Sequence, residues 1–191
     1  MQKRTGITIR LLAVFLTFAA LAAIAALPAF GASPKPWYAA KLEALGFYVF
    51  DPPFIYQDFK VTTLDGGSKT RTSTKGKIVL LNFWATWCPP CRQEIPSIEN
   101  LGAAMKGHDF EIFAVSVGED LATVKSFVAE MKMTFPVYLD PKNTLTRTYA
   151  SQGIPTTYIL DKTGKFIAGM VGAHDYSSPE LIALLKELAQ K

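Results

Sequence analysis

The stretch NFWATWCPPCRQEIP, residues 82–96, holds both cysteines of this 191-residue chain, with two prolines between them. The apolar run IVLLNFW, residues 78–84, leads into it, and apolar residues recur after it at three- and four-residue spacing. This pattern predicts a buried strand, a short loop and a helix that begins at the cysteines. The pair is then a structural disulfide, a metal site or a redox centre.

A redox pair fits this cysteine spacing better than the other two roles. A structural disulfide is common in exported proteins, but a bridge across two residues removes little entropy from the unfolded chain. A metal site needs more ligands, and the chain's two histidines, His108 and His174, match no compact zinc spacing. We therefore expect no metal, with Cys88 as the nucleophile at the helix N-cap and Cys91 as the resolving thiol.

The two intervening prolines affect the chemistry of Cys88. Pro89 and Pro90 suit the first turn of a helix, but neither has the backbone N–H that could stabilise a thiolate. With fewer donors, the pKa of Cys88 is lowered less and the dithiol gives up electrons more readily. We expect a disulfide reductase, and the alternative is an oxidant or isomerase for secreted proteins.

The N-terminus has the pattern of an export signal. Lys3, Arg4 and Arg10 precede an apolar run over residues 11–27. Residues 1–31 are therefore predicted to be a signal peptide, or else a membrane anchor that remains attached. Either form places the rest in the periplasm or another extracytoplasmic space. Loss of the three basic residues lowers the formal charge from +4 to +1, which gives no indication of nucleic-acid binding.

The remaining pattern predicts one α/β domain. Residues 32–53 are assigned to an N-terminal extension with a short helix, and residues 54–191 to the domain itself. The domain is expected to start with a β-hairpin that turns at residues 65–67. The further expected elements are strands at 78–84, 110–117 and 135–139, helices at 121–131 and 145–150, a hairpin turning at 161–164, and a C-terminal helix capped by Ser178. They predict a mixed central sheet flanked by helices.

Several motifs resemble a known family. WCPPC after an apolar strand and GIPTT at residues 153–157 are similar to thioredoxin-fold proteins. More closely, the leader, the hairpin, NFWATWCPPCRQEIP and IPTTYILDKTGK resemble the extracytoplasmic TlpA/ResA-type thiol-disulfide oxidoreductases from about residue 54 onward. The resemblance implies a thioredoxin fold with a strand-helix insertion and a redox-active disulfide between Cys88 and Cys91. It implies no cofactor.

The resemblance also assigns roles to neighbouring residues. Pro155 corresponds to a cis-proline that faces the dithiol, and the backbone of Ile154 is then free to pair with an extended substrate. Glu94 corresponds to an acid that exchanges protons with the dithiol, although a solvated charge on the helix surface is an equal alternative. Asn82 stands where cytoplasmic thioredoxins carry a buried aspartate, so a proton role must lie elsewhere.

The surface around the cysteines is predicted to bind a protein. Trp87, Pro89 and Pro90 are expected to contact the substrate, whereas Trp84 is expected in the core. The expected partners are a protein disulfide, with apocytochrome c implied by the resemblance, and a membrane thiol-disulfide transporter as the electron source. A copper metallochaperone that uses His174 is a third hypothesis, and the close cysteine spacing argues against it. The dithiol motif also disfavours a thiol peroxidase.

Overall fold

The computed structural model describes residues 34–191. Within them, Pro36–Lys191 form one compact unit. The leader predicted at residues 1–31 lies outside the described residues. In the described part, no helix has the length and apolar character required to cross a membrane.

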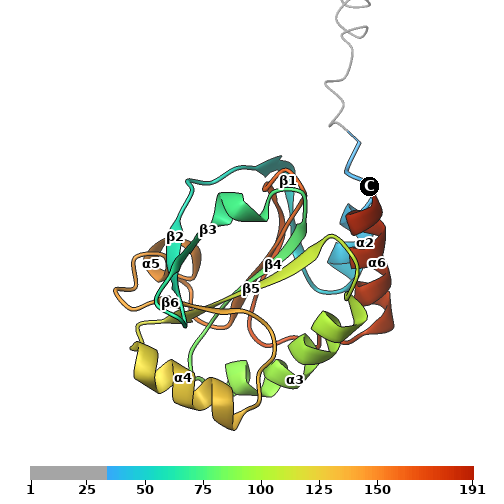
Figure 1. Cartoon of the computed structure of the whole chain (residues 1–191). Helices are drawn as coiled ribbons and strands as arrows, with labels where there is room; N and C mark the ends of the chain where they lie inside the picture. Colours follow the sequence, from blue (N-terminus) through green and yellow to red (C-terminus); the bar gives the residue numbers. More distant parts are fainter. Residues whose placement is uncertain (1–33) are drawn as a thin grey trace, which may run out of the picture. The chain divides into compact units, whose positions relative to one another are not determined.

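The core of the unit is one mixed sheet (Figure 1). Its strands in the described residues are β1 (Tyr48–Phe54), β2 (Lys60–Thr63), β3 (Ser68–Thr70), β4 (Ile78–Trp84), β5 (Phe110–Val117), β6 (Val137–Asp140), β7 (Thr156–Leu160) and β8 (Phe166–Val171). They lie side by side in the order β1-β8-β7-β4-β5-β6-β2-β3. The central strands β4, β5 and β6 are parallel, and the other neighbouring pairs are antiparallel.

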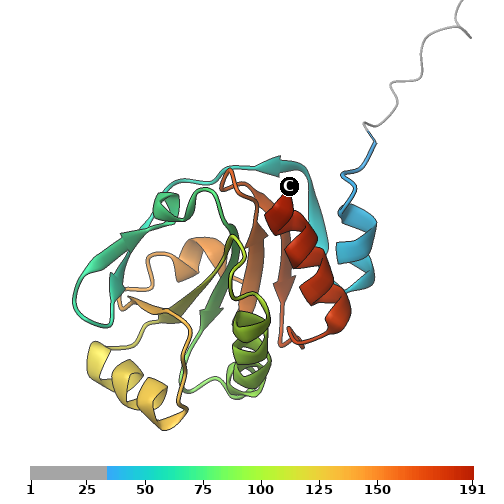
Figure 2. The same cartoon turned by 45° about the vertical axis from the view of Figure 1, so that its right-hand side comes forward.

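Helices cover both faces of this sheet. They are α2 (Ala39–Ala44), the 3-10 helix η1 (Arg71–Thr74), α3 (Pro89–Ala104), α4 (Leu121–Glu130), α5 (Thr146–Tyr149) and α6 (Pro179–Gln190). Successive residues of a strand point to opposite faces. In β4, Asn82 contacts Glu94 of α3, whereas Phe83 stacks on Tyr149 of α5. Helix α3 therefore lies on one face and α5 on the other, with α6 beside α3 (Figure 2).

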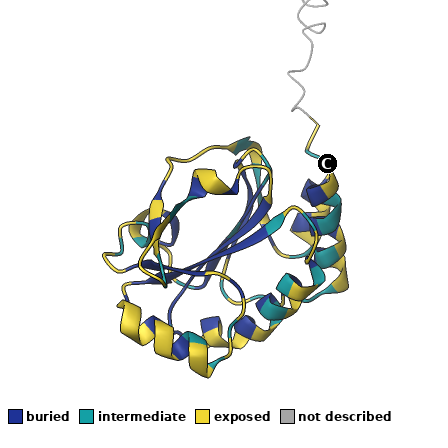
Figure 3. Cartoon of the chain, viewed as in Figure 1, coloured by how far each residue is buried: buried dark blue, intermediate teal, exposed yellow. Residues whose placement is uncertain are grey.

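The core was predicted from the sequence because its two central strands, β4 and β5, are continuous apolar runs. All residues of β4, and all but the first of β5, are buried (Figure 3). Parallel strands covered on both faces appear in a sequence as continuous apolar runs. Helix α3 buries Ile95, Ile98 and Leu101, at the spacing that predicted it.

The hairpins and the C-terminal helix follow the prediction. Strands β2 and β3 pair antiparallel across the turn at residues 65–67, and β7 pairs with β8 across the second predicted turn. Helix α6 begins after Ser178, whose hydroxyl accepts a hydrogen bond from the N–H of Leu181 at 3.3 Å. Between β5 and β7, α4 and β6 form the strand-helix insertion.

The N-terminal segment belongs to the same unit. Strand β1 pairs antiparallel with β8, with Tyr48 opposite Gly169, and Leu42 and Phe47 join the core. The unit therefore begins before residue 54, the boundary that the sequence pattern indicates. The sequence did not predict β1, because it contains Pro52 and is only partly buried, so it lacks the continuous apolar run of a central strand. An edge strand tolerates both features.

Candidate active site

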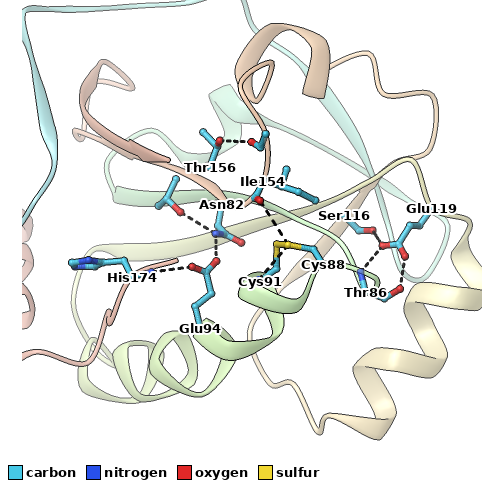
Figure 4. The surroundings of a disulfide bond; sticks show 12 residues. Asn82, Thr86, Cys88, Cys91, Glu94, Ser116, Glu119, Ile154, Thr156 and His174 are labelled. Atoms are coloured by element: carbon cyan, nitrogen blue, oxygen red, sulfur yellow. Dashed lines mark hydrogen bonds between the residues drawn. A yellow bond between two sulfur atoms is a disulfide. The ribbon is translucent and has the colours of Figure 1, made fainter. Parts of the chain in front are cut away.

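The two cysteines form a disulfide where β4 leads into α3 (Figure 4). Cys88 is the N-cap residue of α3, and its sulfur accepts a hydrogen bond from the backbone N–H of Cys91 at 3.3 Å. Pro89 and Pro90 are the first two helical residues. Pro89 and Pro90 have no N–H to donate, as noted from the sequence, and among the described residues the N–H of Cys91 is the one backbone donor to Cys88 Sγ.

The residues around the disulfide are more exposed than its sulfur atoms. Cys88 is 2% exposed and Cys91 1%, so both are buried in this oxidised form. Trp87 is 65% exposed, and Pro89 and Pro90 are also exposed. These three side chains therefore form an exposed surface around the buried disulfide. Trp84 is buried, as expected.

The segment before β7 lies directly against Cys88. The peptide bond between Ile154 and Pro155 is cis, as the resemblance implied. The carbonyl oxygen of Ile154 is 3.8 Å from Cys88 Sγ. Within the described residues, the N–H and carbonyl of Ile154 make no backbone hydrogen bond, because β7 begins at Thr156. An extended polypeptide can pair with these groups beside the sulfur.

Glu94 is a buried acid on the helix that carries the cysteines. It is 3% exposed, so it is no solvated surface charge. Its Oε1 accepts a hydrogen bond from Asn82 Nδ2 at 2.8 Å, and its Oε2 from the N–H of His174 at 3.4 Å. Burial raises the pKa of Glu94 to about 7, although both hydrogen bonds act to lower it. One helical turn from Cys91, this carboxyl can give or take a proton near neutral pH.

Asn82 is held in position to contact Glu94. Its amide nitrogen also donates to the hydroxyl of Thr157 at 2.9 Å. The hydroxyl of Tyr176 donates to the same Thr157 oxygen at 2.7 Å. These bonds hold the Asn82 amide in contact with the Glu94 carboxyl. The amide cannot titrate, whereas the carboxyl can. The group able to exchange protons near the dithiol therefore lies on α3 and not on β4.

The histidines lie outside this arrangement. The imidazole of His174 packs edge-on against Phe47 and Tyr176, and its ring points away from the disulfide in Figure 4. Only its backbone N–H contacts Glu94. His108 lies in the loop between α3 and β5. In the described part of the chain, no group of three or more His, Cys, Asp or Glu residues is arranged to hold a metal ion.

A second buried acid, Glu119, holds the loop that leads to the cysteines. It is 7% exposed and accepts hydrogen bonds from the N–H of Thr86 at 3.0 Å and from the hydroxyl of Ser116 at 2.7 Å. The hydroxyl of Thr86 donates to it as well. Thr86 is two residues before Cys88, so Glu119 fixes the path of the chain into the redox centre. Glu119 was not predicted from the sequence, because an acid after a strand has the pattern of an exposed loop residue.

A groove of about 510 Å³ opens beside the cysteines. Trp87 and Ile154 line it on the side of the redox centre, and Val117, Asn143 and Arg147 are among its other walls. This groove therefore contains two of the residues that the sequence assigned to substrate contact, Trp87 and Ile154.

Comparisons with known proteins agree with this geometry. Residues 55–168 match the AhpC/TSA family. The thiol-disulfide oxidoreductase ResA of Geobacillus thermodenitrificans is 38% identical over 108 residues, which cover 56% of this chain and 62% of that protein. ResA of Bacillus thuringiensis is 35% identical over 131 residues, 69% of this chain and 75% of that protein. The chain thus matches less than two thirds of the first relative and three quarters of the second.

A solved structure shares the fold. It is a thiol:disulfide interchange protein of the thioredoxin family from Chlorobium tepidum, with a TM-score of 0.61 and 29% identity over 72% of this chain and 97% of that one. The thioredoxin fold predicted from the sequence is therefore confirmed. By both the family match and its relatives, the chain belongs to the AhpC/TSA family and, within it, to the ResA-type thiol-disulfide oxidoreductases.

Proposed function

We propose that the protein reduces disulfide bonds in exported proteins. The direction of electron flow is inferred from the contacts that surround Cys88 Sγ. Among residues 34–191 the sulfur has one backbone donor, the N–H of Cys91, and the carbonyl oxygen of Ile154 is 3.8 Å away. A thiolate there gains little from hydrogen bonds and is opposed by the carbonyl dipole. The reduced form is then less favoured, and the dithiol donates electrons readily.

The first step joins the enzyme to its substrate. The thiolate of Cys88 attacks one sulfur of the substrate disulfide and forms a bond with it. The other substrate sulfur leaves as a thiolate and takes up a proton from solvent. The backbone of Ile154 pairs with the extended substrate during this step, and Trp87, Pro89 and Pro90 contact it.

The second step releases the substrate. The thiol of Cys91 gives its proton to the carboxylate of Glu94 and attacks Cys88 Sγ. The bond between Cys88 and the substrate breaks, and the second substrate sulfur leaves as a thiolate and is protonated. The substrate has gained two electrons, and the enzyme is left with the Cys88–Cys91 disulfide.

The predicted leader supports a place for this reaction outside the cytoplasm. That environment is oxidising, so the disulfide must be reduced again by an electron source that crosses the membrane. A membrane thiol-disulfide transporter meets this requirement. Apocytochrome c, whose cysteines must be reduced, is the substrate that the family resemblance indicates.

The reduction potential tests the direction of electron flow. Equilibration of the purified protein with dithiothreitol redox buffers should give a potential close to the roughly −270 mV of thioredoxin. A potential near the roughly −120 mV of a strong periplasmic oxidant would overturn the reductase proposal in favour of an oxidant.

A trapping experiment tests the substrate. In the Cys91→Ala variant the mixed disulfide at Cys88 should persist, because the resolving thiol is absent, and the bound protein can be identified by mass spectrometry. The double variant Cys88→Ala/Cys91→Ala is the control and should trap nothing. Recovery of apocytochrome c or its maturation factors supports the specific role. A broad set of unrelated secreted proteins contradicts it.

A further inference from the structure

One wall of the groove beside the disulfide carries a single charged side chain. The groove residues are Trp87, Val117, Gly118, Asn143, Thr146, Arg147, Ala150, Ser151, Gly153 and Ile154. Arg147 is the only one of these that carries a charge. The same groove includes Ile154, whose carbonyl lies 3.8 Å from Cys88 Sγ. A polypeptide that reaches Cys88 through this groove therefore meets one cation and no anion among the lining residues.

The guanidinium of Arg147 has no partner in the described residues. It is exposed, and neither an ion pair nor a side-chain hydrogen bond is formed by it in that part of the molecule. Arg71, by comparison, is buried and donates to the backbone carbonyls of Gly164 and Tyr56. A planar guanidinium with all its donors unused is well suited to bind a carboxylate through two hydrogen bonds.

The backbone that carries Arg147 is fixed at both ends. Before it, the buried Asp140 accepts hydrogen bonds from the N–H groups of Leu145 at 2.9 Å and Thr146 at 3.0 Å. After it, the buried ring of Tyr149 stacks on Phe83, and its hydroxyl donates to the carbonyl of Gln57 at 2.9 Å. A rigid backbone of this kind fixes the position of a ligand-binding side chain more closely than a flexible loop does.

We propose that Arg147 selects protein substrates that carry an aspartate or glutamate close to the disulfide-bonded cysteine. The substrate chain pairs with Ile154, packs against Trp87 and places its carboxylate on the guanidinium. This inference rests on the proposed oxidoreductase function and adds a preference for acidic sequences to it. Charge complementarity and the continuity of the groove with the redox centre single out this occupant.

Peptide disulfides test the preference. Each peptide is acetylated and amidated, contains one cysteine activated as a 2-pyridyl disulfide, and carries glutamate or glutamine at one of three positions on either side. The fully reduced protein at low ionic strength releases pyridine-2-thione, whose absorbance gives the second-order rate constant. For at least one position, we expect glutamate to react about fivefold faster than glutamine, the size of a well-formed surface ion pair.

Three variants assign that preference. Arg147→Gln should bring the glutamate-to-glutamine ratio close to one. Arg147→Glu should favour glutamine. Lys142→Gln, which removes an exposed cation outside the groove from the loop before α5, should keep the wild-type ratio.

The outcomes separate this inference from the proposed function. A wild-type ratio of one at every position, or a preference that survives Arg147→Gln, overturns selection by Arg147 and leaves the oxidoreductase proposal intact. Failure of the reduced wild-type protein to release thione from any peptide, while dithiothreitol releases it from all of them, overturns the oxidoreductase proposal itself.

Discussion

Replacement of Glu94 by glutamine should change how stability depends on pH. Burial raises the pKa of Glu94 from its ordinary value of 4.5 to about 7. Below about pH 4.5 the carboxyl is protonated in both the folded and the unfolded chain. Between the two values the unfolded chain releases this proton while the folded chain keeps it, so the free energy of unfolding falls as pH rises. Above about pH 7 the whole loss is present.

The size of this loss follows from the two pKa values. A change from 4.5 to about 7, at about 1.4 kcal/mol per pH unit, corresponds to about 3 kcal/mol. Glutamine does not titrate, and its side-chain oxygen can still accept the hydrogen bond from Asn82. The Glu94→Gln variant of the oxidised protein should therefore lack this fall and be more stable than wild type at pH 8.

Urea unfolding measured at half-unit steps from pH 4 to pH 8 gives the required curve for each protein. Glu130→Gln, at an exposed position near the end of α4, is the control and should follow wild type. If wild type and Glu94→Gln show the same pH dependence, Glu94 does not hold its proton at neutral pH. The proton-transfer role proposed for it then fails as well.

Three further substitutions probe the site. Pro90→Ala adds an N–H that can donate a hydrogen bond to the Cys88 thiolate. One charge-assisted hydrogen bond of about 1.5 kcal/mol should raise the reduction potential, measured in dithiothreitol buffers, by roughly 30 mV. An unchanged potential would mean that the missing donors at the prolines do not set the potential. Trp87→Ala removes a side chain that is 65% exposed, so KM for a protein disulfide should rise severalfold while urea unfolding changes by less than about 0.5 kcal/mol. Glu119→Ala leaves the half-buried N–H of Thr86 and the buried hydroxyl of Ser116 unpaired, and should destabilise the protein by about 1–3 kcal/mol in the same assay. An unaffected stability would mean that Glu119 does not hold this loop.

Local patterns were sufficient to predict the centre of the fold. Strands β4 and β5 are continuous apolar runs because helices cover both faces of the sheet there. The position of Cys88 at the N-cap followed from the strand, the two prolines and the periodic helix after them. The burial of Glu94 lay beyond such patterns, because it depends on Asn82 and His174, which approach it from distant parts of the chain.

Three other features could not be predicted in the same way. Glu119 gains its role from Thr86, which is 33 residues away in the chain. Arg147 has the sequence context of an ordinary surface residue, and the substrate selection proposed for it follows only from the groove that it lines. Strand β1 contains two prolines and no regular apolar alternation, so only its pairing with β8 identifies it as a strand. Each depends on contacts between residues that are distant in the sequence.

The two outermost strands affect how the protein behaves among unfolded chains. An exposed sheet edge offers unpaired backbone groups on which a foreign strand can assemble, and this is a common route to aggregation. Strand β1 has Pro52 and Pro53, which cannot donate a backbone hydrogen bond, and β3 has only three residues. In the described part of the molecule, an extended polypeptide therefore finds better pairing groups at Ile154 than at either edge. The two edges of the sheet are in this way protected from pairing with foreign chains.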